Sequence, residues 1–216
     1  MANNEPMQNK IDYSLYLVTD RELMTTEKIE ECVEQAIKGG CTMVQLREKT
    51  SSREFYQTAL QVQEVTKRQN VPLIINDRID IALAVDADGV HIGQNDLPYE
   101  AVRRVVGQNK IVGISVSNIT EAYIAADQGA DYLGVGAMFF TETKTDAHLV
   151  DMEELRNIRN SVSIPIIVIG GINEKTIPLF KNIGIDGVAV ISAIVSKKNI
   201  KSASRKLKTL IMEVKR

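Results

Sequence analysis

Four short stretches of the chain repeat one pattern: GCTMV at 40–44, ADGVH at 87–91, GADYL at 129–133 and GIDGV at 184–188. In each stretch, a small residue that closes a helix is followed by a polar residue, usually Asp, and then by an apolar run typical of a strand. The stretches recur at intervals of roughly 45 to 55 residues, which is too long for a solenoid repeat and suits a pair of βα units repeated four times.

Short apolar or β-branched runs fill the intervals between these starts. The runs span residues 15–19, 42–46, 73–75, 89–92, 111–116, 132–135, 166–169 and 187–191. Residues 27–38 and 53–68 place apolar side chains on one helical face, and residues 97–106, 118–129 and 151–160 have the length of a helix. Ser51 and Ser52 precede Glu54, which indicates a helix N-cap at the start of the second helix.

Eight strands that alternate with helices predict the α/β class and a single (β/α)8 TIM barrel over residues 1–216. Residues 1–10 are polar, and we expect them to form a flexible N-terminal extension outside the barrel. An open, doubly wound sheet fits less well, because no G-x-G-x-x-G follows the first strand.

The composition excludes several classes of function. The 216 residues include 26 Lys and Arg against 28 Asp and Glu, a formal net charge of -2 that argues against a general nucleic-acid or membrane-surface protein. Aromatic residues make up 5% and Trp is absent, which also argues against a base-stacking platform. The absence of a signal peptide and the two isolated cysteines, Cys32 and Cys41, predict reduced thiols in a cytoplasmic protein.

Functional side chains of a barrel lie where its strands end, and the second run ends in QLREK at 45–49. Strand alternation places Gln45 and Arg47 on one face, and Val44 and Leu46 on the other. Burying these polar side chains costs free energy unless negatively charged groups lie beside them. A layer of internal ion pairs and a phosphate clamp that includes Lys49 both satisfy this requirement, and the residues alone leave the choice open.

Two carboxylates follow the next two runs, Asp77 after the third and Asp96 after the fourth. They are candidates for acid–base catalysis, for Mg²⁺ binding and for helix capping, and the position of Asp96 just before Pro98 favours capping. The interpretation as Mg²⁺ ligands is favoured if a phosphate group also binds there, because phosphate oxygens can complete the coordination of the ion. Ser115, at the end of the fifth run, is either a turn residue or a hydroxyl donor to a phosphate.

The last connections suggest a second anion site. The segment 137–150 is long for a barrel loop and carries Thr141, Thr143 and Lys144, so we expect it to contact an anionic substrate. Gly170–Gly171 and Ser192 follow the last two runs, where barrels often bind phosphate through backbone N–H groups. Together these sites predict room for two anionic groups and a divalent ion.

Five of these stretches also occur in the order of a known motif set. They are QLREK at 45–49, ND at 76–77, GQNDLP at 93–98, TETK at 141–144 and GGI at 170–172. From about Tyr16 to Ser192 the chain resembles the thiamine phosphate synthase family. The resemblance implies a transferase that joins hydroxymethylpyrimidine diphosphate to hydroxyethylthiazole phosphate and releases thiamine phosphate and pyrophosphate.

The resemblance also implies roles for individual residues. It assigns the pyrimidine diphosphate to Gln45, Leu46, Arg47, Glu48, Lys49, Asn76, Ser115 and Lys144. It assigns the thiazole phosphate to Thr141, Glu142, Thr143, Gly171, Ile191 and Ser192. Mg²⁺, the implied cofactor, would bind Asp77 and Asp96, and the catalytic groups would be Arg47, Lys144 and Ser115.

The implied reaction is dissociative and needs no protein nucleophile. We expect no Ser–His or Cys–His pair, with His91 in the core and His148 on the long loop. Two residues depart from the family's pattern: Ala137 stands where the family often has Pro, and Phe140 is bulkier than its usual counterpart. Both precede the Thr-rich segment that would contact the thiazole and keep water from the cation.

Two other functions are compatible with parts of the sequence. A thiazole tautomerase-like barrel would bind only the thiazole product and would not use the Gln-x-Arg-x-Lys stretch or two metal carboxylates. A noncatalytic phospho-ligand-binding or nucleic-acid-associated protein finds support only in the tail 197–216, with eight basic residues and one acidic residue. We instead expect that tail to be the last barrel helix, because it carries an apolar stripe. The stripe consists of Ile200, Ala203, Leu207, Leu210, Ile211 and Val214. The expected partners are therefore the two phosphorylated substrates, without nucleic acid or membrane, and a homo-oligomer is left open.

Overall fold

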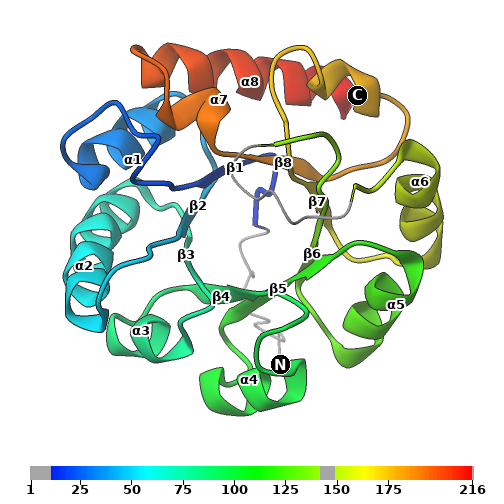
Figure 1. Cartoon of the computed structure of the whole chain (residues 1–216), viewed down its shortest axis with the longest axis horizontal. Helices are drawn as coiled ribbons and strands as arrows, with labels where there is room; N and C mark the ends of the chain where they lie inside the picture. Colours follow the sequence, from blue (N-terminus) through cyan, green and yellow to red (C-terminus); the bar gives the residue numbers. More distant parts are fainter. Residues whose placement is uncertain (1–10, 142–148, 216) are drawn as a thin grey trace, which may run out of the picture.

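The computed structural model of the chain describes residues 11–141 and 149–215. Eight parallel strands pair in sequence order and close into a barrel, which confirms the predicted (β/α)8 fold (Figure 1). The strands are β1 Leu15–Val18, β2 Met43–Leu46, β3 Leu73–Asn76, β4 Gly89–Ile92, β5 Ile111–Val116, β6 Tyr132–Val135, β7 Ile166–Val168 and β8 Gly187–Val190. Each begins and ends within one or two residues of the run that predicted it. The N-terminal extension expected at 1–10 lies outside the described residues.

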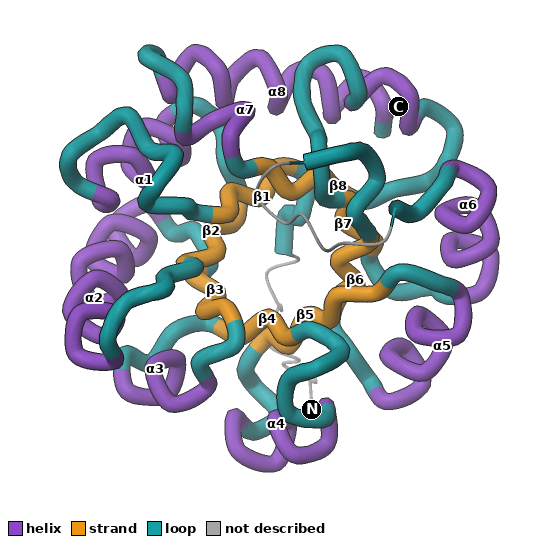
Figure 2. The backbone as a smooth tube through the Cα atoms, viewed as in Figure 1, coloured by secondary structure: helices purple, strands orange, loops and turns teal. Residues whose placement is uncertain are grey.

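The helices form a ring around the barrel (Figure 2). They are α1 Ile29–Lys38, α2 Ser52–Gln69, α3 Ile79–Ala84, α4 Tyr99–Val106, α5 Ile119–Gln128, α6 Met152–Ser161, α7 Ser192–Val195 and α8 Ile200–Val214. The N-cap predicted before α2 is present at Ser51, whose side chain accepts from the Glu54 N–H, and the structure adds the reciprocal contact of a capping box. Among the described residues, no helix has the length and apolar character needed to cross a membrane.

The connection from β7 to β8 differs from the regular alternation. It contains only the 3₁₀ helix η1 Ile177–Phe180 instead of a full α-helix. Pro178 lacks an N–H in the first turn, and Asn182 and Gly184 have positive φ angles of 65° and 85°, so the chain turns toward β8. Helix α8 packs against η1 and α1 and closes this side of the ring (Figure 1).

Strand alternation divides the core into two clusters. The outer cluster lies between strands and helices and includes Leu15, Leu17, Val44 and Leu46. The inner cluster fills the barrel and consists of Tyr16, Val18, Met43, Ile74, Tyr132, Ile167 and Ala189. Helix α8 adds its predicted apolar stripe to the outer cluster, with Ile200, Leu207 and Ile211 almost fully buried.

The two cysteines are buried free thiols, as the sequence predicts. Burial raises the pKa of the Cys32 thiol to about 11, and burial likewise raises the pKa of the Cys41 thiol to about 12. Neither thiol is a thiolate near neutral pH, so both act as small apolar core residues.

Candidate active site

A cavity of about 180 Å³ opens at the carboxyl end of the barrel, where the fold places functional side chains. All eight strands or the residues that follow them contribute to its lining. The predicted site residues that line it are Gln45, Arg47, Asn76, Ser115, Thr141, Gly171, Ile191 and Ser192. The structure therefore brings together members of both predicted subsites.

A second, wider hollow of about 770 Å³ adjoins this cavity, and the two share Thr141, Gly171, Ile172 and Ser192 as lining residues. Lys49, Lys175 and Lys197 lie along this hollow. Lys49 is thus placed at the mouth of the site rather than beside the barrel interior. Asp20, Glu22 and Glu174 line the same hollow, so its charged side chains are balanced and the lysines alone do not identify an anion site.

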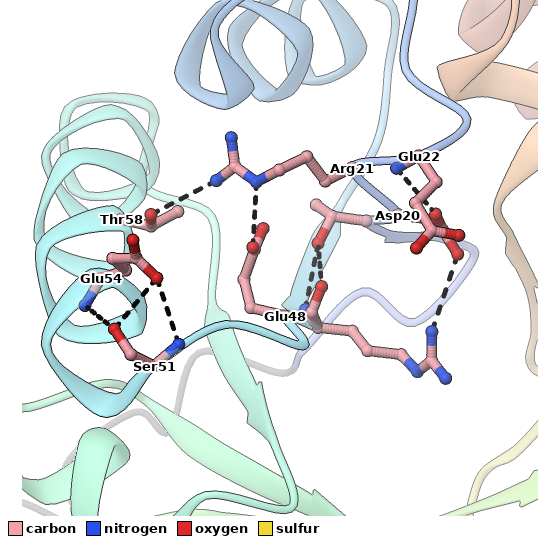
Figure 3. A network of polar contacts seen from close by, with 9 residues as sticks. Asp20, Arg21, Glu22, Glu48, Ser51, Glu54 and Thr58 are labelled. Atoms are coloured by element: carbon pink, nitrogen blue, oxygen red, sulfur yellow. Dashed lines mark hydrogen bonds and ion pairs between the residues drawn. The ribbon is translucent and has the colours of Figure 1, made fainter.

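Only alternate residues of the QLREK stretch face the cavity. Leu46 is fully buried in the outer cluster, between the barrel and its helices. Glu48 turns away toward Arg21, whose Nε donates to its Oε2 at 3.0 Å beside the start of α2 (Figure 3). The structure thus separates Leu46 and Glu48, which the resemblance assigned to the pyrimidine diphosphate, from the cavity-lining Gln45 and Arg47.

Arg47 is held at the rim by contacts from the segment after β1. Its backbone N–H donates to Thr19 Oγ1 at 3.0 Å, and its guanidinium lies 3.6 Å from the Asp20 carboxylate. The side chain remains partly exposed, so its other N–H groups are available to a ligand. A guanidinium in this position can bind two oxygens of a phosphate at once.

Asp77 and Asp96 face one another, as predicted for two carboxylates at successive strand ends. Asp77 adopts the left-handed conformation with φ 59°, and its N–H donates to the His91 carbonyl at 2.9 Å. Burial, followed by the negative charge of Asp96, raises the pKa of Asp77 to about 6 even though Arg47 opposes the shift. Neither Asp77 nor Asp96 is among the residues that line the cavity, although Asn76, which precedes Asp77, is. Two facing carboxylates are nevertheless a suitable pair of oxygen ligands for a hard divalent cation.

The capping role favoured for Asp96 is wrong. The N-cap of α4 is Pro98, and no side chain caps this helix. The Asp96 carboxylate instead accepts from the Gly93 N–H at 2.6 Å, which holds the loop after β4 against the site. Within the described part of the chain, no group of three or more His, Cys, Asp and Glu side chains could hold a metal, so any cation here would depend on ligand oxygens as well.

The glycine pair after β7 allows the loop after β6 to pass close by. Gly170 and Gly171 have φ angles of 95° and 64°, and a Cβ on Gly170 would lie 2.6 Å from the Ala137 Cβ. The Met138 N–H donates to the Ile169 carbonyl at 2.9 Å and the Phe139 N–H to the Gly170 carbonyl at 3.1 Å. These bonds position Thr141 over the cavity.

The two family departures occupy different environments. Ala137 is buried and lines the cavity, whereas Phe140 is 78% exposed beside the wider hollow. The predicted thiazole residues Glu142 and Thr143, the predicted catalytic residue Lys144 and the loop residue His148 all lie outside the described residues.

Sequence reasoning missed three polar side chains that line the same cavity: Tyr16, His91 and Tyr132. His91 is buried as predicted, but its Nε2 lies 2.8 Å from Ser115 Oγ. The expectation of no Ser–His pair is therefore wrong. The other ring nitrogen, Nδ1, contacts the Tyr132 hydroxyl at 2.9 Å rather than a carboxylate, so the pair lacks the acidic third member of a nucleophilic triad.

The comparisons with known proteins agree across the whole barrel. The model of the family described as "Thiamine monophosphate synthase" matches residues 15–194. The thiamine-phosphate synthase of Clostridium beijerinckii is 58% identical over 209 residues, which cover 96% of this chain and 100% of that protein. The thiamine-phosphate synthase of Ruminiclostridium cellulolyticum is 60% identical over 202 residues, 93% of this chain and 96% of its own.

A solved structure shows the same likeness in three dimensions. The thiamine phosphate pyrophosphorylase of Pyrococcus furiosus superposes with a TM-score of 0.87 at 38% identity. The superposition covers 94% of this chain and 98% of that one.

Proposed function

The chain belongs to the thiamine monophosphate synthase family, and from this membership we propose that it is a thiamine-phosphate synthase. Such a transferase condenses 4-amino-2-methyl-5-hydroxymethylpyrimidine diphosphate with 4-methyl-5-hydroxyethylthiazole phosphate. Its products are thiamine phosphate and pyrophosphate. The observation that carries the proposal is the identity of 58% over 96% of the chain to a protein of that name.

Arg47 and Asn76 would bind the pyrimidine diphosphate on one side of the cavity, with Lys49 at its mouth. The proposal is supported by Arg47, which lines the cavity and whose guanidinium makes only a long, 3.6 Å contact with the Asp20 carboxylate. Lys144 would contribute a second cation from the loop after β6. Two cations beside a leaving group would lower the free energy of the transition state because negative charge accumulates there.

Asp77 and Asp96 would hold Mg²⁺, and their facing carboxylates fit this role. When bound, the ion supplies positive charge that stabilises the departing diphosphate oxygens. Asp77 would enter the site as a carboxylate above about pH 6, the pKa that burial and Asp96 give it. Below that pH a proton would compete with the cation for the pair.

The reaction we propose is a dissociative substitution. The bond between the pyrimidine methylene carbon and the diphosphate oxygen breaks, and its electron pair leaves with pyrophosphate. The thiazole nitrogen then donates its lone pair to the methylene cation, forming the new C–N bond. Apolar walls from Val18, Ile169 and Ile172 would keep water away from the cation, with Ser115 beside the pyrimidine.

The thiazole phosphate would lie opposite, between Thr141, Gly171 and Ser192, where the cavity meets the wider hollow. Gly171 and the first turn of α7 at Ser192 offer backbone N–H groups on this side. Ile191 would form part of the wall behind the ring. This placement gives the two substrates opposite sides of one cavity.

The test is to incubate purified protein with both substrates and Mg²⁺ and to measure thiamine phosphate and pyrophosphate together. Equal amounts of the two products are expected, and neither should form when the thiazole phosphate is omitted. Formation of neither product in the complete mixture would contradict the proposed function, and binding of thiazole phosphate alone would then favour the tautomerase-like alternative.

A further inference from the structure

Five side chains form an unbroken chain of hydrogen bonds beneath the cavity, running from β2 to β5. Gln45 Nε2 donates to Tyr16 Oη at 2.9 Å, and Tyr16 Oη lies 2.9 Å from Tyr132 Oη. Tyr132 Oη contacts His91 Nδ1 at 2.9 Å, and His91 Nε2 contacts Ser115 Oγ at 2.8 Å. The two ends, Gln45 and Ser115, are residues that the family resemblance assigns to the pyrimidine diphosphate.

The barrel is built to accommodate this chain. Gly113 leaves no room for a Cβ against the Tyr132 ring, and a Cβ on Gly134 would lie 3.0 Å from His91 Cε1. The Tyr132 ring stacks on His91 with 5.5 Å between centroids and meets the Tyr16 ring edge-on at 5.9 Å. These contacts hold the three rings in place and so fix the positions of the polar atoms in the chain of hydrogen bonds.

In this chain of hydrogen bonds, every group donates in the same direction, from Gln45 toward Ser115. Burial raises the pKa of both Tyr16 and Tyr132, so each phenol keeps its single proton. Since Tyr16 Oη accepts from Gln45, its own proton is directed to the Tyr132 oxygen. Tyr132 must then donate to His91 Nδ1, because a buried hydroxyl proton without an acceptor is costly.

The direction continues through the imidazole to the cavity. A neutral imidazole that accepts at Nδ1 carries its proton on Nε2, and that proton is donated to Ser115 Oγ. The Ser115 hydroxyl proton is thereby left to point into the cavity. At the other end, Gln45 has used its amide nitrogen on Tyr16, so its Oε1 can turn toward the ligand as an acceptor.

We propose that Tyr16, Tyr132 and His91 are positioning residues that set this polarity and thereby select a 4-aminopyrimidine over the corresponding 4-oxopyrimidine. The inference rests on the proposed function and names the group by which the site would recognise its first substrate. An aminopyrimidine offers a ring nitrogen as acceptor and an amino group as donor, which complements the Ser115 hydroxyl and Gln45 Oε1. The oxo analogue carries a ring N–H and a carbonyl oxygen, so it presents the opposite pattern and leaves polar groups unpaired.

The first test measures the tautomer of His91 directly. The sequence contains two histidines, so protein labelled with ¹⁵N-histidine gives two imidazole spectra, and a His148→Gln variant assigns them. Nε2 of His91 is expected to carry the proton and Nδ1 to have the chemical shift of an unprotonated nitrogen. A proton on Nδ1, or on both nitrogens, would overturn the proposal.

The second test removes one hydroxyl from the middle of the chain. Tyr132→Phe is expected to lower the ratio of kcat/KM for the amino over the oxo pyrimidine diphosphate by at least about tenfold, because the polarity of both ends is no longer fixed. Tyr13→Phe is the matched control. The centroid of the Tyr13 ring lies 5.4 Å from that of Tyr132. Within the residues that the structure describes, however, the Tyr13 hydroxyl takes no part in this series of hydrogen bonds. An unchanged ratio in Tyr132→Phe, or an equal loss in Tyr13→Phe, would overturn the proposal.

Thermal melting of each variant separates a folding defect from a loss of selectivity. If Tyr132→Phe is unstable, His91→Gln gives the same comparison from the next position in the chain of hydrogen bonds. The wild-type assay separates this inference from the proposed function. A wild-type protein that forms thiamine phosphate but does not prefer the amino substrate contradicts only the polarity inference, whereas a protein that forms no product contradicts the function.

Discussion

Replacement of Asp77 by Asn is expected to make the metal-free protein more stable while it removes activity. The Asp77 carboxyl lies against Asp96, and burial together with that charge raises its pKa from 3.8 to about 6. Asn has the same shape and tolerates the left-handed backbone that Asp77 adopts at φ 59°, so the substitution removes the charge without straining the loop.

The magnitude follows from the difference between the folded and unfolded pKa values. The shift from 3.8 to about 6 corresponds to at most about 3 kcal/mol, and because this carboxyl is only partly buried, solvent screening reduces it to about 1 kcal/mol. For a chain of this size, 1 kcal/mol changes the melting temperature by roughly 2–4 °C.

The sign depends on pH. Because the folded pKa is the higher one, the native state binds more protons between about pH 4 and pH 6, and wild-type stability falls as the pH rises through that window. The advantage of Asp77→Asn should therefore be near zero at about pH 4 and complete above about pH 6. Thermal melting in EDTA at both ends of the window measures this difference.

Asp80→Asn provides a control with the opposite expectation. The hydrogen bond from Arg78 holds the pKa of Asp80 below its usual range, so removal of that carboxylate should not raise the melting temperature at neutral pH. Mg²⁺ should stabilise the wild type and not Asp77→Asn, since only the wild type keeps both carboxylates. A variant that melts no higher than the wild type at neutral pH, or that gains equally at both pH values, would refute the repulsion between Asp77 and Asp96.

Four further outcomes are expected. Arg47→Ala and Lys144→Ala should each lower kcat/KM by at least about 100-fold, and near-normal rates in both would exclude their role on the diphosphate. EDTA should abolish product formation and excess Mg²⁺ should restore it, whereas full activity in chelator would exclude the metal site. A chain that ends at Ser196 lacks α8 and should not melt cooperatively, and a melting curve like that of the full chain would contradict the role of α8 as a barrel helix. Gly170→Ala should lower the melting temperature more than Gly107→Ala, because both have positive φ but only Gly170 faces a neighbouring loop, so equal losses would argue against the close passage of the two loops.

The sequence predicted the barrel well because its signals are local. A strand that begins after a small residue and an Asp, and ends before a polar group, is recognisable within about ten residues. The missing helix between β7 and β8 shows the limit of that reasoning. The regular repeat predicted a helix there, but Pro178 and the positive φ angles at Asn182 and Gly184 produce a short 3₁₀ turn instead.

Part of the site could also be predicted from alternation along single strands. Gln45 on β2 and Arg47 directly after it both face the cavity because they are two residues apart along an extended chain, as the period of a strand requires. The resemblance assigned the whole stretch to the ligand, yet Leu46 belongs to the outer core and Glu48 pairs with Arg21. A motif that is contiguous in sequence is thus divided by the strand into two faces with different functions.

The polar chain beneath the cavity could not be predicted because its members come from five different strands. Tyr16, Gln45, His91, Ser115 and Tyr132 meet only through the register of the closed barrel, which pairs Asn76 with His91 and Gly113 with both His91 and Tyr132. A local pattern shows a histidine within an apolar run and favours a core residue. The one local signal was glycine inside strands, at Gly113 and Gly134, where a missing side chain indicates close approach by another group. Such glycines, taken together with polar residues on neighbouring strands, are therefore the feature from which a buried polar network in a barrel can be inferred before its structure is known.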